Sequence, residues 1–144
     1  ALPYAEHNVL ADPEAAQVVY GAGVPLTLIG LDVTTKVQID EEGRRLLARG
    51  DALAAALAEQ IRLYPRFRER GGWTYLHDPL AVGVAIDASL VRARELVVKV
   101  ETRGEHTSGQ LVASLPNGET ANALVALEVE AERFRRFFLD RLTG

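Results

Sequence analysis

Apolar and polar positions alternate in blocks that predict short helices and strands following one another. Residues 13–20 are apolar at helical spacing, with Asp12 in the N-cap position and Pro13 in the first helical position. Residues 25–33 are almost all apolar, which is typical of a strand covered on both faces. A helix followed by such a strand predicts half of a parallel α/β unit.

Two more helices are predicted in the middle of the chain. Asp40 suits the N-cap of a helix that ends near Arg49, and Asp51 suits the N-cap of the next one. The second of these helices has a predicted buried face at helical spacing: Leu53, Leu57, Ile61 and Tyr64. Four arginines lie at the end of this helix and just after it, near Tyr64 and Phe67: Arg62, Arg66, Arg68 and Arg70. We interpret them as a solvated helix edge rather than a nucleic-acid surface.

The last third of the chain predicts strands and a closing helix. Residues 79–86 are apolar almost all round, so we expect a helix buried on several sides. Strands are predicted at 95–101, 109–115 and 121–129, and Asn117-Gly118 favours a hairpin between the last two. The helix from residue 130 has a predicted buried stripe of Phe134, Phe137, Phe138 and Leu142.

The bulk composition excludes several classes of protein. A chain of 144 residues with 48% hydrophobic and 25% charged residues suits one soluble domain with a core. The net charge of −4 disfavours nucleic acid as a partner, and the lack of cysteine excludes disulfides and thiolate metal sites. The apolar runs fall far short of the ~20 residues that span a membrane, and the start lacks a signal-peptide pattern, so we expect a cytoplasmic protein. The lack of methionine suggests a piece of a longer product.

The stretch 73–82 carries the densest chemistry. Two aromatic residues lead to His77 and Asp78, directly before Pro79 and an apolar helix. Histidine titrates near neutrality and aspartate is a hard oxygen ligand, so the pair could hold a proton donor beside a metal. The alternatives are that Asp78 caps the helix and that His77 is a half-buried, hydrogen-bonded side chain.

Other polar residues are weaker candidates. Glu6 and Asn8 lie two positions apart, so in an extended segment they would share a face and could grip hydroxyl groups. Plain loop polarity is the alternative for this pair, and exposed solvation is the favoured interpretation of His106. The sequence contains no Gly-x-Ser-x-Gly elbow, phosphate-binding glycine loop or Cys-His pair, so hydrolysis through a protein nucleophile has no evident agent.

Several segments together resemble the inosine-uridine preferring nucleoside hydrolase family. They occur in the family's order and cover nearly the whole chain: residues 5–8, 11–16, 30–34, 76–81 and 100–105, with Thr107 and Gly109. The resemblance is to the C-terminal half, because the family's N-terminal cluster Asp-x-Asp-x-Gly-x-Asp-Asp is missing. It implies that residues 1–144 are the C-terminal portion of one hydrolase domain, inactive without the N-terminal half.

The resemblance also implies roles for individual residues. Asp78 matches a calcium ligand, and His77 matches the histidine that helps protonate the departing base in purine-accepting members. Glu6 and Asn8 match a pair that binds ribose hydroxyls, although His7 replaces the aromatic residue usual between them. Tyr64 lies near the place where some members set an aromatic ring against the base.

The resulting hypothesis is an α/β protein with a largely parallel open sheet flanked by helices and a C-terminal β-hairpin region. As the resemblance implies, the complete protein would be a Ca2+-dependent enzyme, usually oligomeric, that hydrolyses ribonucleosides in nucleoside catabolism and purine salvage. A non-catalytic ribose-binding module is the alternative; it would keep Glu6 and Asn8 without needing His77 beside Asp78. A third hypothesis is an α/β interaction domain whose polar groups are all caps and loops.

Overall fold

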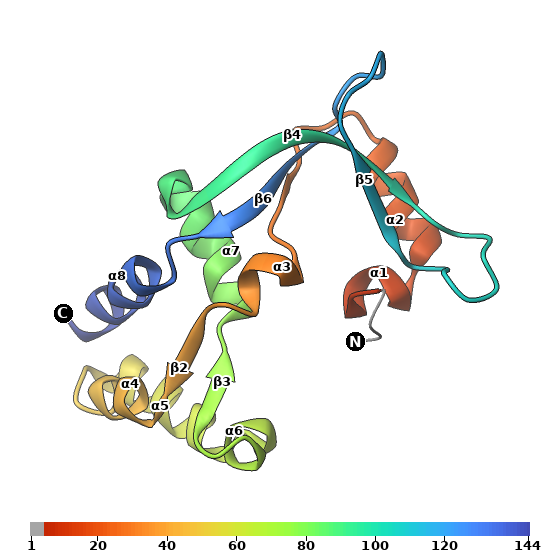
Figure 1. Cartoon of the computed structure of the whole chain (residues 1–144). Helices are drawn as coiled ribbons and strands as arrows, with labels where there is room; N and C mark the ends of the chain where they lie inside the picture. The colour runs from red at the N-terminus through yellow and green to blue at the C-terminus, as the bar shows by residue number, and fades with distance from the viewer. Residues whose placement is uncertain (1–4) are drawn as a thin grey trace. The chain divides into compact units, whose positions relative to one another are not determined.

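The computed structural model describes residues 5–144, which divide into two compact units (Figure 1). The first unit holds Ala93–Ala126 and the described residues up to Leu28, and the second holds Ile29–Arg92 and Leu127–Gly144. The mixed α/β class predicted from the sequence is confirmed, since helices and strands occur in both units. No helix in the described range is long and apolar enough to cross a membrane.

The first unit contains two helices and most of a four-stranded sheet. Helices α1 (His7–Ala11) and α2 (Pro13–Gly21) come first, and α2 begins as predicted because the Asp12 carboxylate accepts a 2.8 Å hydrogen bond from the Ala15 amide. The sheet order is β1-β6-β4-β5. Its strands are β1 (Thr27–Leu28), β4 (Val91–Val100), β5 (Leu111–Ser114) and β6 (Ala123–Val129).

The core of the first unit is built on the sheet. Buried residues of β4 and β6 form it: Leu96, Val98, Ala123 and Val125. Tyr20 at the end of α2 packs against this cluster. The Asn122 side-chain amide donates 3.0 and 2.8 Å hydrogen bonds to the Tyr20 and Val98 carbonyls and accepts one from the Val98 amide. These bonds connect the end of α2 to β4, because the half-buried Asn122 amide binds backbone groups of both elements.

Two predicted strand arrangements are wrong in detail. The apolar run 25–33 forms only the short strand β1, parallel to β6, and then turns at Gly30 into helix α3 (Leu31–Thr34). An apolar run by itself does not distinguish a buried strand from a buried helix. Strand β5 pairs antiparallel with β4 and not with β6, although Gly118 has the positive φ expected of the turn.

The second unit packs helices around a two-stranded ladder of β2 (Gln38–Asp40) and β3 (Trp73–Tyr75), as Figure 1 shows. Its helices are α3, α4 (Glu41–Leu47), α5 (Ala52–Leu63), α6 (Pro65–Glu69), α7 (His77–Ile86), the 3-10 turn η1 (Ala88–Leu90) and α8 (Ala131–Thr143). Asp40 and Asp51 cap α4 and α5 as predicted. The largest fully buried side chains of this unit include Phe134, Leu80, Leu90, Ile39 and Leu47.

The predicted buried faces of two helices need correction. In α5 the buried residues are Ala54, Ala58 and Ile61, whereas Leu53 is 68% exposed. The small alanines allow α5 to approach its neighbours closely, so the packed face is not the one with the largest apolar side chains. Helix α7 buries Leu80, Gly83 and Val84 but exposes Val82 and Ile86 at 61% each, so it is packed within this chain on one side.

Candidate active site

The candidate site lies where β3 ends and α7 begins. β3 is held by antiparallel pairing with β2, in which Tyr75 lies opposite Gln38, and the Leu76 amide donates a 3.1 Å hydrogen bond to the Val37 carbonyl. The chain therefore leaves the ladder in a fixed direction and enters α7 at His77. The helix predicted from Pro79 to Ile86 is present, but it begins two residues earlier than predicted, at His77.

His77 is half-buried and hydrogen-bonded from one side. Its Nδ1 lies 2.8 Å from the Thr34 hydroxyl oxygen, and its ring centroid lies 5.0 Å from that of Tyr75. Burial lowers the pKa of His77; the Asp78 carboxylate opposes this shift, and the Arg70 guanidinium adds to it. Because Nδ1 is engaged by Thr34, Nε2 is the ring nitrogen left for a ligand in the adjoining pocket.

Asp78 does not cap the helix that contains it. The N-cap of α7 is Leu76, and no side chain caps it. The carboxylates of Asp12, Asp40 and Asp51 each accept a backbone hydrogen bond at a helix start. For Asp78 the described residues provide no such partner, and its side chain is exposed at the rim of a pocket. Its oxygen atoms are therefore available to a ligand, and the capping alternative fails on geometry.

A pocket of about 510 Å3 joins His77 and Asp78 to an aromatic residue predicted as part of the site. Tyr64, at the end of α5, lines this pocket together with Arg70 and Tyr75. The volume falls in the range of small-molecule sites, ~300–1,000 Å3. Three of the five predicted site residues are thus brought together by the fold of the second unit.

Glu6 and Asn8 belong to the first unit, and they do not lie in the extended segment that would set both on one face. Glu6 is the N-cap of α1, where its Oε1 accepts a 2.9 Å hydrogen bond from the Val9 amide. Asn8 is an exposed residue within α1. The helix forms because Glu6 satisfies an amide that an extended chain would leave to water. One Glu6 oxygen remains for a ligand hydroxyl.

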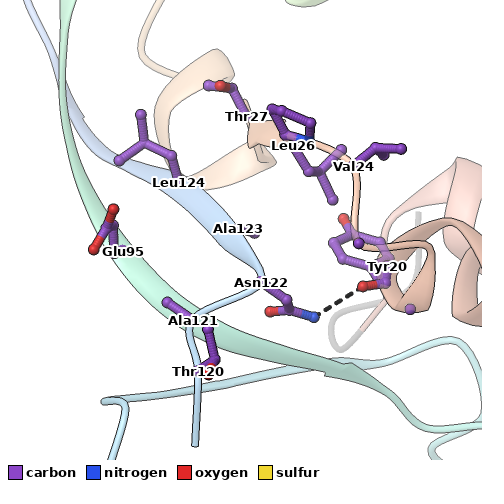
Figure 2. Close-up of a pocket in the computed structure, with 13 residues that line it drawn as sticks. Tyr20, Val24, Leu26, Thr27, Glu95, Thr120, Ala121, Asn122, Ala123 and Leu124 are labelled. Carbon is purple, nitrogen blue, oxygen red and sulfur yellow. Dashed lines mark hydrogen bonds between the residues drawn. The ribbon is translucent and has the colours of Figure 1, made fainter.

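A larger cavity of about 710 Å3 lies in the first unit and lacks comparable chemistry (Figure 2). Its wall is formed by the segment after α2 and by the sheet, and Figure 2 shows the Asn122 amide directed at the Tyr20 carbonyl. Glu95 is its one carboxylate, and no histidine lines it. We therefore take the smaller pocket, lined by His77 and Asp78, as the candidate active site.

The side chains near the pocket could bind a metal ion only together with further ligands. In the described residues 5–144 no three His, Cys, Asp or Glu side chains are grouped to hold an ion. Calcium takes six to eight oxygen ligands, and the exposed Asp78 carboxylate has no hydrogen-bond or ion-pair partner among residues 5–144. The described residues can therefore supply one ligand side chain, that of Asp78, to a metal ion whose other ligands come from elsewhere.

Three residues of this pocket region were not predicted as site residues. Thr34 binds His77 from α3, and Arg70 and Tyr75 line the pocket. The alternation of Trp73, Tyr75 and His77 was the available signal, because alternate strand residues share one face. Arg62 and Arg66 form exposed ion pairs with glutamates of their own helices, as the solvated-edge interpretation predicts, whereas Arg70 contacts aromatic rings.

Comparisons with known proteins agree with the resemblance seen in the sequence. The family model described as inosine-uridine preferring nucleoside hydrolase matches residues 1–136. The pyrimidine-specific ribonucleoside hydrolase RihA of Shewanella woodyi is 35% identical over 97% of this chain, and that of Escherichia coli strain K12 is 34% identical over 97%. The chain spans 46% and 47% of these relatives, about half of their length.

Solved structures show the same fold. A purine-preferring ribonucleoside hydrolase from Gardnerella vaginalis superimposes with a TM-score of 0.88 at 30% identity, covering 98% of this chain and 46% of that one. The plant nucleoside hydrolase PpNRh1 also gives 0.88, at 26% identity, covering 99% and 48%. Relatives named for pyrimidines and for purines are thus both similar to this chain.

Proposed function

This chain belongs to the inosine-uridine preferring nucleoside hydrolase family, and on that premise we propose that it forms the C-terminal portion of a hydrolase domain. The complete protein hydrolyses the N-glycosidic bond of ribonucleosides to give free base and ribose. The isolated chain is inactive, because one candidate ligand carboxylate and one histidine do not make a full catalytic set. The observation that carries the proposal is the pocket shared by His77, Asp78 and Tyr64.

Asp78 supplies an oxygen ligand to a calcium ion in the complete protein. Its support is the exposed carboxylate at the pocket rim, free of the capping role that the other helix-start aspartates have. The ribose hydroxyls would chelate such an ion, and the ion would make water more nucleophilic. Glu6 and Asn8 bind ribose hydroxyls through the second Glu6 oxygen and the exposed Asn8 amide.

His77 acts on the departing base. As the C1′–N bond breaks, negative charge develops on the base, and the free Nε2 of His77 donates a hydrogen bond or a proton to it. The Thr34 hydroxyl can donate to Nδ1 or accept from it, so it holds the ring in either protonation state. Tyr64 lies against the base as an aromatic wall. We propose purine nucleosides among the substrates, in nucleoside catabolism and salvage.

Ribose release from inosine and uridine by the purified complete protein, with and without a calcium chelator, tests this function. We expect reducing sugar from the nucleosides and its loss on chelation. Nucleoside binding without ribose release would favour the binding-module alternative instead. We also propose that the complete protein is a cytoplasmic homo-oligomer; light scattering and cell fractionation test those two points.

A further inference from the structure

Arg70 is held over two aromatic rings beside the candidate site. It follows α6 directly, and Gly71 and Gly72 then reverse the chain into β3 with φ values of 80° and 94°. This turn places the Arg70 guanidinium carbon 4.9 Å from the Trp73 ring centroid and 4.7 Å from the Tyr75 ring centroid. Both distances lie within the ~6 Å reach of a cation–π contact.

The guanidinium of Arg70 is held by aromatic rings and has no acidic partner among the described residues. In the part of the chain that the structure describes, no carboxylate pairs with it and its N–H groups make no hydrogen bond within the chain, whereas Arg62 and Arg66 bind Glu59 and Glu69. Aromatic faces orient a guanidinium without occupying its donors. Arg70 therefore presents five N–H donors and a full charge at the pocket that it lines with His77.

The rings connect this charge to the histidine. Trp73 and Tyr75 meet edge to face at 5.1 Å, and Tyr75 meets His77 at 5.0 Å, so the three rings form a continuous row. Arg70 contacts the first two members of the row. Arg70 and the third member, His77, both line the same pocket. Arg70 and His77 thus act on the same part of the pocket.

We propose that Arg70 is a further catalytic residue whose guanidinium contacts the nucleobase and stabilises the negative charge leaving with it; this rests on the hydrolysis proposed above. In that reaction the electron pair of the C1′–N bond remains on the base nitrogen. The oxygen of water bonds to C1′, and the proton that water loses balances the one that the base gains. A fixed cation beside the base favours this charge separation without itself transferring a proton.

The expected loss of kcat on replacing Arg70 depends on how far its side chain is exposed to solvent. Removing one charge-stabilising donor from an enclosed site costs about 10²–10³-fold in kcat. Arg70 is exposed to solvent, which screens its charge, so we expect a smaller effect of about tenfold. Arg68 provides a matched control, because it is an exposed arginine of α6, two residues before Arg70, that does not line the pocket.

The test compares leaving groups in the complete protein. Arg70→Met should lower kcat for inosine and uridine by about tenfold. For p-nitrophenyl β-ribofuranoside, kcat should fall by no more than about twofold, because the p-nitrophenolate leaving group is stable as an anion without help from the protein. Arg68→Met should leave both rates unchanged. If Arg70→Met fails to fold, Arg70→Gln, which keeps polarity without charge, replaces it, with thermal melting as the check on folding.

Each outcome bears on the proposal. A selective loss on nucleosides, with Arg70→Lys recovering part of it, supports the role in base departure. Equal losses on both substrates, or no loss, overturn it while the hydrolysis by the unmodified protein still stands. No ribose release from any substrate by the unmodified protein would overturn the proposed function together with the role of Arg70.

Discussion

The imidazole Nδ1 of His77 lies 2.8 Å from the hydroxyl oxygen of Thr34, a residue 43 positions earlier in the chain. Thr34 is only 3% exposed, and α3 holds it against the start of α7. The contact fixes which ring nitrogen faces the pocket. It is the one hydrogen bond that the structure gives the His77 side chain within the described range.

Thr34→Val should impair turnover by removing that hydroxyl without changing the side-chain shape. Leaving Nδ1 unpaired costs about 1–3 kcal/mol, so the ring should lose its preferred orientation. We expect kcat for nucleosides to fall about tenfold, and nitrogen NMR of the imidazole to show a changed tautomer balance. Thr34→Ser keeps the hydroxyl and serves as the control. An unchanged NMR spectrum in Thr34→Val would contradict a positioning role.

His77→Ala should slow purine nucleoside turnover at least about tenfold in the complete protein, because general acid help is typically worth ~10²–10⁴-fold. Calcium affinity should change little, since His77 is not among the proposed ligands. Steady-state kinetics and calorimetric titration measure the two effects. His106, whose side chain is 86% exposed, is the control position. Unchanged turnover in His77→Ala would remove this histidine from the mechanism.

Asp78→Ala should abolish calcium binding by the complete protein. The physical reason is the loss of a charged oxygen ligand that has no other partner among the described residues. Isothermal titration with Ca2+ measures the affinity, and Asp140→Ala, at an exposed position of α8, is the matched control. Retained affinity would exclude Asp78 from the ligand set.

Asp40 should make the stability of the fold depend on acid pH. The hydrogen bond from the Gly43 amide is the largest cause that holds the pKa of this carboxyl below its ordinary value. Burial opposes this shift, and the charge and hydrogen bond of Arg135 add to the lowering. A carboxyl whose pKa is lowered by folding stabilises the folded state at pH values above its unfolded pKa of ~3.9. This stabilisation is lost as the pH falls through the lower pKa of the folded state. Urea unfolding should therefore show the advantage over Asp40→Asn shrinking from pH 6 towards about pH 3. A constant difference would contradict this linkage.

Gly83→Ala should destabilise the second unit. A β-carbon there would lie 2.6 Å from Cε2 of Phe134, a ring that is 1% exposed and has no room to withdraw. Overpacking of this kind costs about 1–3 kcal/mol in the free energy of unfolding. Gly21→Ala, at the end of α2 with no atom within 4 Å of the new carbon, is the control and should be neutral or stabilising. Denaturant unfolding compares the two.

Local hydrogen bonding explains which parts of the fold were predictable. Asp12, Asp40 and Asp51 each bind an amide three residues ahead, so their helix starts follow from neighbours in the sequence. Partner choice among strands is a different matter. Gly118 has a positive φ, but Asn117 does not, and β5 pairs with β4 because sheet pairing depends on packing across the whole unit.

The sequence by itself identified the family, predicted a helix beginning near Pro79 and singled out His77 and Asp78 as a candidate pair, because residue types and their order along the chain can be recognised without knowing how distant elements pack. Only the tertiary structure decided that Tyr64 shares their pocket and that Thr34 engages His77. It also placed the Arg70 guanidinium over the rings of Trp73 and Tyr75. Such contacts join separate elements, and their geometry is set by how β2, β3 and the surrounding helices pack.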